Sequence, residues 1–162
     1  MARTVSIGCQ DFETIRREGC FYIDKTSFLS EWWENGDSVT LIARPRRFGK
    51  TLNMSMTEQF FSIKYAGRGE LFEGLSIWEK QEYRELQGTY PVLALSFADI
   101  KQTTFEQTRK AMCRIIKMAY NQYDFLMKSD LFNESEKEDF RSISADMEDS
   151  QAAFSLKLLS NY

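Results

Sequence analysis

The chain has 162 residues, of which 43% are hydrophobic and 14% aromatic, and 24 acidic against 21 basic side chains give a net charge of -3. That length suits one globular domain that buries about 70% of its unfolded surface. The charge excludes a global attraction to nucleic acid or anionic lipid, so we expect no direct nucleic-acid binding. The sequence contains no histidine, which excludes Ser-His-Asp and Cys-His catalysis and histidine-ligated metals.

Neither a membrane segment nor a disulfide framework is indicated by the sequence. No apolar run approaches the ~20 residues that span a bilayer, and the first residues lack the apolar core of a secretory signal. The three cysteines, Cys9, Cys20 and Cys113, are widely spaced and form no CxxC pair. We therefore expect a cytoplasmic protein with reduced, mostly structural thiols and no membrane partner.

The first half of the chain predicts a helix, a strand and a second helix. Asp24 or Thr26 can cap the first helix, which is expected to end at Gly36. The run 38–43 is β-branched and lacks period-two alternation, which is typical of a central parallel strand covered on both faces. A helix over 51–65 follows, because apolar residues recur there at helical spacing.

The second half predicts one further strand among helices. A short helix is expected over 76–87, and the run 91–97, which begins with a proline and precedes Asp99, is the second expected strand. Capping signals then predict three helices, which start at Thr104 with Gln107, at Asn133 with Glu136, and at Asp149 or Ser150.

Helices that alternate with doubly covered strands predict an α/β fold. Such sheets average about five strands, and this chain offers two, or three if residues 20–23 also pair. The last residues, 155–162, end on an apolar stripe without a stop signal. We therefore expect residues 1–162 to form the N-terminal part of a single domain, truncated after that half, whose incomplete sheet lets it self-associate.

The loop between the first strand and its helix, residues 44–51, has the pattern of a phosphate-binding loop. Gly49 lets the backbone approach phosphates, the Lys50 ammonium reaches the β- and γ-phosphates, and the Thr51 hydroxyl ligates magnesium. The sequence thus predicts ATP and Mg²⁺ as ligands. The residues expected to hold them are Arg46, Arg47, Phe48, Gly49, Lys50, Thr51 and Leu52.

The loop departs from the full pattern at its start. Arg44 stands where the first glycine belongs, and Pro45 removes one amide, although neither change touches the amides nearest the phosphates. A chance Gly-Lys-Thr tripeptide is the alternative. Arg46 and Arg47 have three open roles: anion ligands, a finger that reaches a neighbouring subunit's nucleotide, or a solvated turn.

Three segments together resemble the predicted AAA-ATPase-like family of bacteria. They read IGCQDFETIR at 7–16, FYIDKT at 21–26 and RPRRFGKT at 44–51, and arginine at the first-glycine position is part of that family's pattern. Shorter matches follow at 71–75 and 90–92. The resemblance implies a P-loop NTPase domain, a three-layer sandwich with a mostly parallel sheet. It also implies an ATP-binding role, in proteins that often carry a C-terminal domain similar to restriction-type nucleases.

The resemblance also implies what surrounds the loop. The strand with the acidic Walker B pair follows a segment like 155–162, so we expect nucleotide binding here without hydrolysis. Asp99 is a candidate for the missing magnesium carboxylate, with a turn acid as its alternative. Ile23 and Asp24 are expected to flank the adenine, unless the aromatic residues around them simply cover one face of the sheet.

The leading hypothesis is therefore the ATP-binding domain of an AAA-like P-loop ATPase. The alternative is a non-hydrolysing module for nucleotide sensing or protein interaction, in which the loop holds a nucleotide as a structural ligand. A P-loop phosphotransferase is a third possibility, for which the sequence shows no acceptor-side base near the loop.

Overall fold

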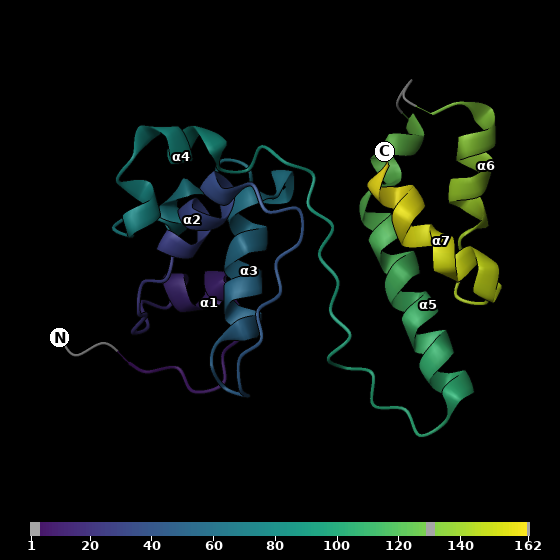
Figure 1. The fold of residues 1–162 in the computed structure, drawn as a ribbon, viewed down its shortest axis with the longest axis horizontal. Helices are drawn as coiled ribbons and strands as arrows, with labels where there is room; N and C mark the ends of the chain where they lie inside the picture. The colour runs from purple at the N-terminus through teal and green to yellow at the C-terminus, as the bar shows by residue number, and fades with distance from the viewer. Residues whose placement is uncertain (1–3, 129–131, 162) are drawn as a thin grey trace. The chain divides into compact units, whose positions relative to one another are not determined.

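The computed structural model describes residues 4–128 and 132–161, which fold into helices joined by turns and extended segments. These residues divide into two compact units between Val92 and Leu93 (Figure 1). The first unit contains α1 (Phe12–Arg17), α2 (Ser27–Asn35), α3 (Lys50–Phe61), the 3₁₀ turns η1 (Ile63–Tyr65), η2 (Gly69–Leu71) and η3 (Ser76–Trp78), and α4 (Gln81–Leu86). The second contains α5 (Phe105–Gln122), the 3₁₀ turn η4 (Asp124–Lys128), α6 (Glu134–Ser142) and α7 (Asp149–Ser160).

The expected α/β sandwich with a mostly parallel sheet is wrong for the described residues. They contain no sheet, and their strand-like pairing is one isolated parallel bridge between Ser62 and Tyr90. The run 38–43 is extended, and Val39 and Leu41 in it are 88% and 87% exposed. A strand is stabilised by a ladder of backbone hydrogen bonds, and β-propensity depends on that tertiary context. Residues 38–43 have no such ladder, so they form an extended segment and not a strand.

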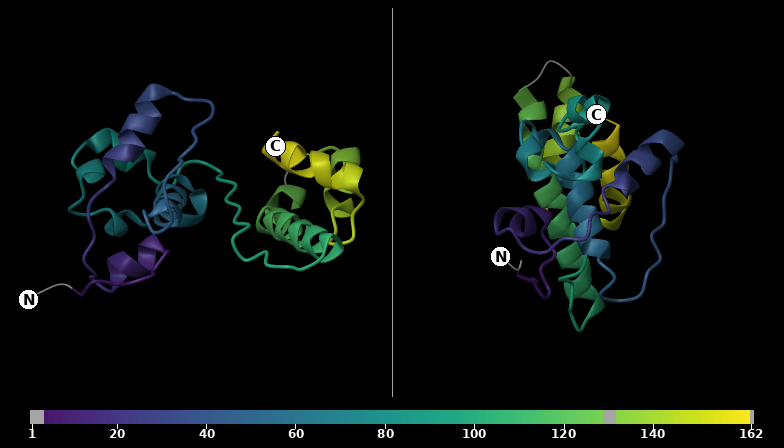
Figure 2. Two further views of the ribbon diagram at one scale, coloured as in Figure 1. Left: turned by 60° about the horizontal axis from the view of Figure 1, so that its bottom comes forward. Right: turned by 90° about the vertical axis from the view of Figure 1, so that its left-hand side faces the viewer.

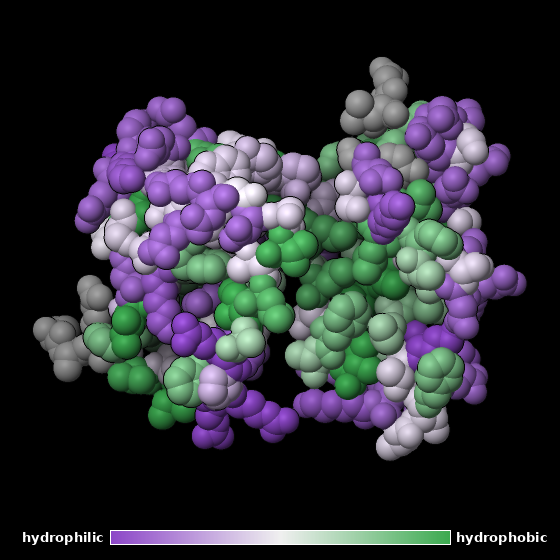
Figure 3. Space-filling model, viewed as in Figure 1, coloured by the Kyte–Doolittle hydropathy of each residue, from purple (hydrophilic) through white to green (hydrophobic). Residues whose placement is uncertain are grey.

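The run 91–97 is extended in the same way. Leu93 and Leu95 lie two residues apart, so they share one side of the extended chain, and both pack against the core of the second unit. The expected doubly covered strand is thus an extended segment without sheet pairing among the described residues. Apolar side chains lie at the surface of both units (Figure 3). Phe105, at the start of α5, is 81% exposed.

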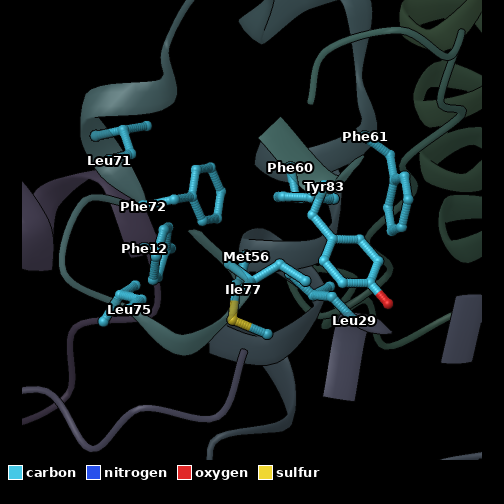
Figure 4. Close-up of a cluster of buried hydrophobic side chains, with 10 residues drawn as sticks. All are labelled: Phe12, Leu29, Met56, Phe60, Phe61, Leu71, Phe72, Leu75, Ile77 and Tyr83. Carbon is cyan, nitrogen blue, oxygen red and sulfur yellow. The ribbon is translucent and has the colours of Figure 1, made fainter. Parts of the chain in front are cut away.

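The core of the first unit is rich in aromatic rings (Figure 4). Phe12 of α1 stacks on Phe72 with ring centroids 5.2 Å apart, and Phe60 of α3 meets the same ring edge-on at 5.1 Å. Further buried members are Leu29, Met56, Phe61, Leu71, Leu75, Ile77 and Tyr83. Trp32, Trp33 and Trp78 belong to the same unit, and Trp32 and Trp33 pack against Phe61. This packing holds α3 in place.

The expected helices of this unit are confirmed with shifted ends. α2 stops at Gly36, whose left-handed φ of 63° ends the helix as expected. α3 stops at Phe61 rather than at 65, because Ser62 is extended and its side chain accepts a hydrogen bond from the Lys64 amide, which starts η1. The expected helix over 76–87 is divided into η3 and α4.

The second unit has a separate core between α5, α6 and α7 (Figures 1 and 2). Asn133 forms the expected capping box with Glu136, and Thr104 accepts from the Gln107 amide at 3.3 Å without the reciprocal bond. The cap of α7 is Glu148, not Asp149 or Ser150 as expected. The Tyr120 hydroxyl of α5 donates to the Ser155 carbonyl of α7 at 2.6 Å. The core residues are Cys113, Ile116, Ala119, Tyr120, Leu126, Phe132, Phe140, Ile143, Met147 and Leu159.

The described residues include all three cysteines and the helices α1 to α7. The three cysteines are free, and Cys20 and Cys113 are buried, as expected for structural thiols. None of the helices in the described ranges combines the length and the apolar character that crossing a bilayer requires. Tyr162, the last residue of the expected C-terminal stripe, lies outside the described residues.

Candidate functional site

The candidate site is the exposed loop 44–51, which ends in the first turn of α3. Gly49 is the N-cap of α3 and has a left-handed φ of 73°. Arg47 is also left-handed, with a φ of 67°. Left-handed backbone costs a residue with a side chain about 1–2 kcal/mol. The loop therefore needs glycine at 49 and holds Arg47 in a strained conformation.

The N-terminus of α3 is open to an anion. The Asn53 amide donates to the Gly49 carbonyl at 2.9 Å, so helical hydrogen bonding starts at that carbonyl. The preceding amides of Lys50, Thr51 and Leu52 have no partner within the helix. No side chain caps this end of α3. These amides and the positive end of the helix dipole together favour a negatively charged ligand.

The Lys50 side chain folds back across the loop. Its ammonium donates to the carbonyl oxygens of Arg44 and Pro45, the latter at 2.9 Å. Two neutral carbonyls compensate an ammonium less well than an anion does. Lys50 is thus held at the loop by bonds that an incoming phosphate can replace.

The other predicted loop residues differ in what they offer. Arg46, Arg47 and Thr51 are exposed, so their polar groups can reach a ligand from solvent. Phe48 is also exposed, at 59%. Leu52 packs against the core of the first unit, so its side chain anchors α3 and only its amide faces the loop end.

Asp24, predicted to lie beside the base, has its carboxylate engaged within the protein. One oxygen accepts from the Thr26 amide at 2.8 Å and hydroxyl at 2.7 Å, and the other accepts from the Ser76 amide at 2.7 Å. Burial raises the pKa of Asp24, but the hydrogen bonds from Ser76 and Thr26 outweigh it and hold the pKa below its ordinary value. Ile23, in contrast, is 64% exposed.

Lys25, between those two positions and Thr26, was not among the predicted site residues. Its ammonium lies 3.9 Å from the point that a Cβ on Gly49 would occupy. The sequence holds little sign of this, because 23 residues lie between the two positions and the approach depends on packing. The one hint was that Lys25 belongs to the FYIDKT segment beside a predicted base contact.

Asp11 joins α1 to α3, the helix that carries the loop. Its carboxylate caps α1 by accepting from the Thr14 amide at 2.8 Å, and it also accepts from the side-chain amide of Gln59 on α3 at 2.8 Å. Burial raises the pKa of Asp11, but hydrogen bonds from Thr14, Gln59 and Ser55 together lower it. The role of Asp11 in these hydrogen bonds is structural.

The donor set fits a polyphosphate better than a bare metal ion. Across the described ranges, no three acidic or cysteine side chains gather where they could hold a metal. Magnesium commonly uses substrate phosphates and water as ligands, with few protein groups. A magnesium ion held by the Thr51 hydroxyl would therefore need phosphate oxygens and water as its other ligands.

Comparison with known proteins supports the resemblance seen in the sequence. A family model described as predicted AAA-ATPase matches residues 6–158. The chain belongs to the predicted AAA-ATPase family. It is 35% identical over 96 residues to an "Uncharacterized protein in vnfD 5'region" of Azotobacter chroococcum mcd 1, a match covering 59% of this chain and 17% of that protein. The chain thus corresponds to a small part of this relative, and no solved structure matches it.

Membership of the predicted AAA-ATPase family suggests that nucleotide and metal are used. The match of the family model confirms the resemblance seen in the segments 7–16, 21–26 and 44–51. The nuclease-like C-terminal domain implied by the resemblance stays a prediction, as do the individual roles of the loop residues.

Proposed function

We propose that this chain binds ATP as its magnesium complex through the loop 44–51. The observation that carries the proposal is the uncapped N-terminus of α3, entered through left-handed Gly49 and accompanied by Lys50. Membership of the predicted AAA-ATPase family supports a nucleoside triphosphate as the anion. The exposed side chains of Arg46 and Arg47 lie in the same loop, where their positive charge also favours an anion.

Each group has a role that follows from its position. The amides of residues 50–52 donate to phosphate oxygens, and the Lys50 ammonium exchanges its bonds to Arg44 and Pro45 for the phosphate chain. The Thr51 hydroxyl ligates the metal. When bound, magnesium supplies charge neutralisation of the phosphates.

We further propose that binding by this chain proceeds without appreciable turnover. Hydrolysis needs a carboxylate that holds the magnesium shell and orients the attacking water. Asp24, the acid beside Lys25, uses both oxygens on Thr26 and Ser76 and is not free for that role. This favours nucleotide binding as a structural or sensing event. A phosphate-release assay tests it: release at an ordinary enzyme rate of about 1 per second or more contradicts the proposal.

Isothermal titration calorimetry with Mg-ATP tests the binding itself. Lys50→Ala removes a charged hydrogen bond and is expected to weaken binding by about 1.5–3 kcal/mol. Lys64→Ala is the matched control, because Lys64 follows the opposite end of α3 and pairs with Glu58 at 3.8 Å. Equal affinity of the wild type and Lys50→Ala removes the phosphate-loop assignment.

A further inference from the structure

Lys25 brings a second ammonium to the N-terminus of α3. Its Nζ atom lies 3.9 Å from the Cβ position of Gly49, the residue that caps this helix. Lys50 follows Gly49 as the first residue of α3, and its ammonium is bound to the carbonyls of Arg44 and Pro45. Two lysines from separate segments of the first unit therefore gather at one helix end.

The turn that carries Lys25 is fixed on both sides. Thr26 is fully buried, and its hydroxyl donates to Asp24, accepts from the Ile77 amide at 3.1 Å and lies 3.0 Å from the Ser76 hydroxyl. The Lys25 carbonyl accepts from the Phe28 amide at 3.1 Å at the start of α2. The backbone of Lys25 is thus preorganised, so only its side chain has to be ordered on binding.

The charge of Lys25 is uncompensated at this position. The ion pairs found among residues 4–128 and 132–161 do not include it. It instead lies near the positive end of a helix dipole, at the N-cap of a helix whose first residue is also a lysine. Such an arrangement is unfavourable without an anion and favourable with one.

We propose that Lys25 binds the phosphate chain of the nucleotide, as a second lysine ligand beside Lys50. The inference rests on the proposed nucleotide binding at the loop, and it assigns to the FYIDKT turn a direct part in holding the ligand. The proposed ligand of Lys25 is a polyphosphate, and this contact does not require the nucleobase.

Calorimetry with two probes, Mg-ATP and inorganic tripolyphosphate with magnesium, tests this assignment. Lys25→Met is expected to weaken both by about tenfold to a hundredfold, the usual effect of losing one charged hydrogen bond. Lys25→Arg keeps the charge and is expected to recover part of the loss. Lys64→Met, at the other end of α3, is the matched control and leaves both affinities unchanged. A loss with Mg-ATP but not with tripolyphosphate overturns a phosphate contact.

The failure of this inference is distinct from failure of the proposed function. If wild-type protein binds neither probe, or if Lys50→Met binds as tightly as wild type, the phosphate loop itself is wrong. If Lys50→Met loses affinity while Lys25→Met does not, the loop stands and the role of Lys25 is overturned.

Lysine labelling of the wild-type protein supplies a readout that needs no variant. Acetic anhydride modifies exposed amines, and mass spectrometry reports the extent at each lysine. Saturating Mg-ATP is expected to protect Lys25 and Lys50 and to leave Lys64 unchanged. Protection of Lys50 without protection of Lys25 overturns the inference, even if Lys25→Met fails to fold.

Discussion

At the scale of single residues, a comparison of two glycines distinguishes the effect of backbone strain from an effect on ligand binding. Gly49 caps α3 and Gly74 lies in the turn before η3, and both have a φ of 73°. A Cβ on Gly74 meets nothing within 4 Å, and one on Gly49 meets the Lys25 ammonium at 3.9 Å. The two positions thus share the same strain in similarly open surroundings.

Replacing either glycine by alanine is expected to lower the free energy of unfolding by about 1–2 kcal/mol, because alanine is strained in the left-handed region. Only Gly49→Ala is expected to weaken Mg-ATP binding as well, since its backbone enters the loop. Urea denaturation and calorimetry measure the two effects. Equal Mg-ATP affinity of Gly49→Ala and Gly74→Ala would show that Gly49 has no part in the site.

Arg44 is expected to be dispensable for binding. Its carbonyl, not its side chain, accepts from Lys50, and glycine provides the same carbonyl with more backbone freedom. Arg44→Gly should therefore bind Mg-ATP at least as tightly as wild type in calorimetry. A large loss of affinity would instead identify the guanidinium as a ligand.

The carboxylate of Asp24 predicts how stability depends on pH. Its pKa is below the ordinary value of 3.8 in the folded state. A carboxylate whose pKa is lower in the folded state than in the unfolded state stabilises the fold fully at pH values above its unfolded pKa. This stabilisation is lost as the pH falls through its folded pKa. When the free energy of unfolding is measured as a function of pH, it should fall less steeply below about pH 4 for Asp24→Asn than for the wild type. Asp37→Asn, at an exposed acid after α2, is the control. An unchanged decline in Asp24→Asn would contradict the role of this carboxylate.

At the scale of elements, local signals predicted α2, α3, α5, α6 and α7 but failed for the strands. They did not predict α1 or the break between η3 and α4. Thr104 and Asn133 act through amides three residues away, so a capping residue can be recognised from its neighbours alone. The run 38–43 has strong β-propensity, but a ladder depends on distant partners that its own residues do not specify. The loop 44–51 is contiguous and could be proposed from its own residues, whereas the approach of Lys25 to Gly49 depends on packing.

The contact between α5 and α7 gives a test at this scale. The Tyr120 hydroxyl donates to the Ser155 carbonyl in the core of the second unit. Tyr120→Phe removes that donor and is expected to lower the free energy of unfolding by about 1–2 kcal/mol, measured by urea denaturation with circular dichroism. Tyr90→Phe, at a side chain that is 41% exposed, should cost much less. Equal costs would show that the buried bond contributes little.

At the scale of the whole molecule, exposed apolar side chains point to self-association. Val39 and Leu41 are almost fully exposed in the extended run 38–43. Extended apolar segments pair with copies of themselves when no neighbour covers them. We expect a concentration-dependent dimer in light scattering, and the Val39→Lys, Leu41→Lys double variant should reduce it through charge repulsion. A wild-type protein that stays monomeric over the whole concentration range would contradict this expectation.

The division into two cores has a spectroscopic consequence. Trp32, Trp33 and Trp78 are the three tryptophans of the chain, and all lie in the first unit. Indole fluorescence therefore reports the melting of that unit, whereas far-ultraviolet circular dichroism also records α5, a helix of 18 residues in the second. If the cores melt separately, the two probes give different midpoints, and one free energy of unfolding does not describe the chain. If Mg-ATP binds at the loop 44–51 as proposed, we expect it to raise the fluorescence midpoint and to leave the remaining dichroism transition unchanged.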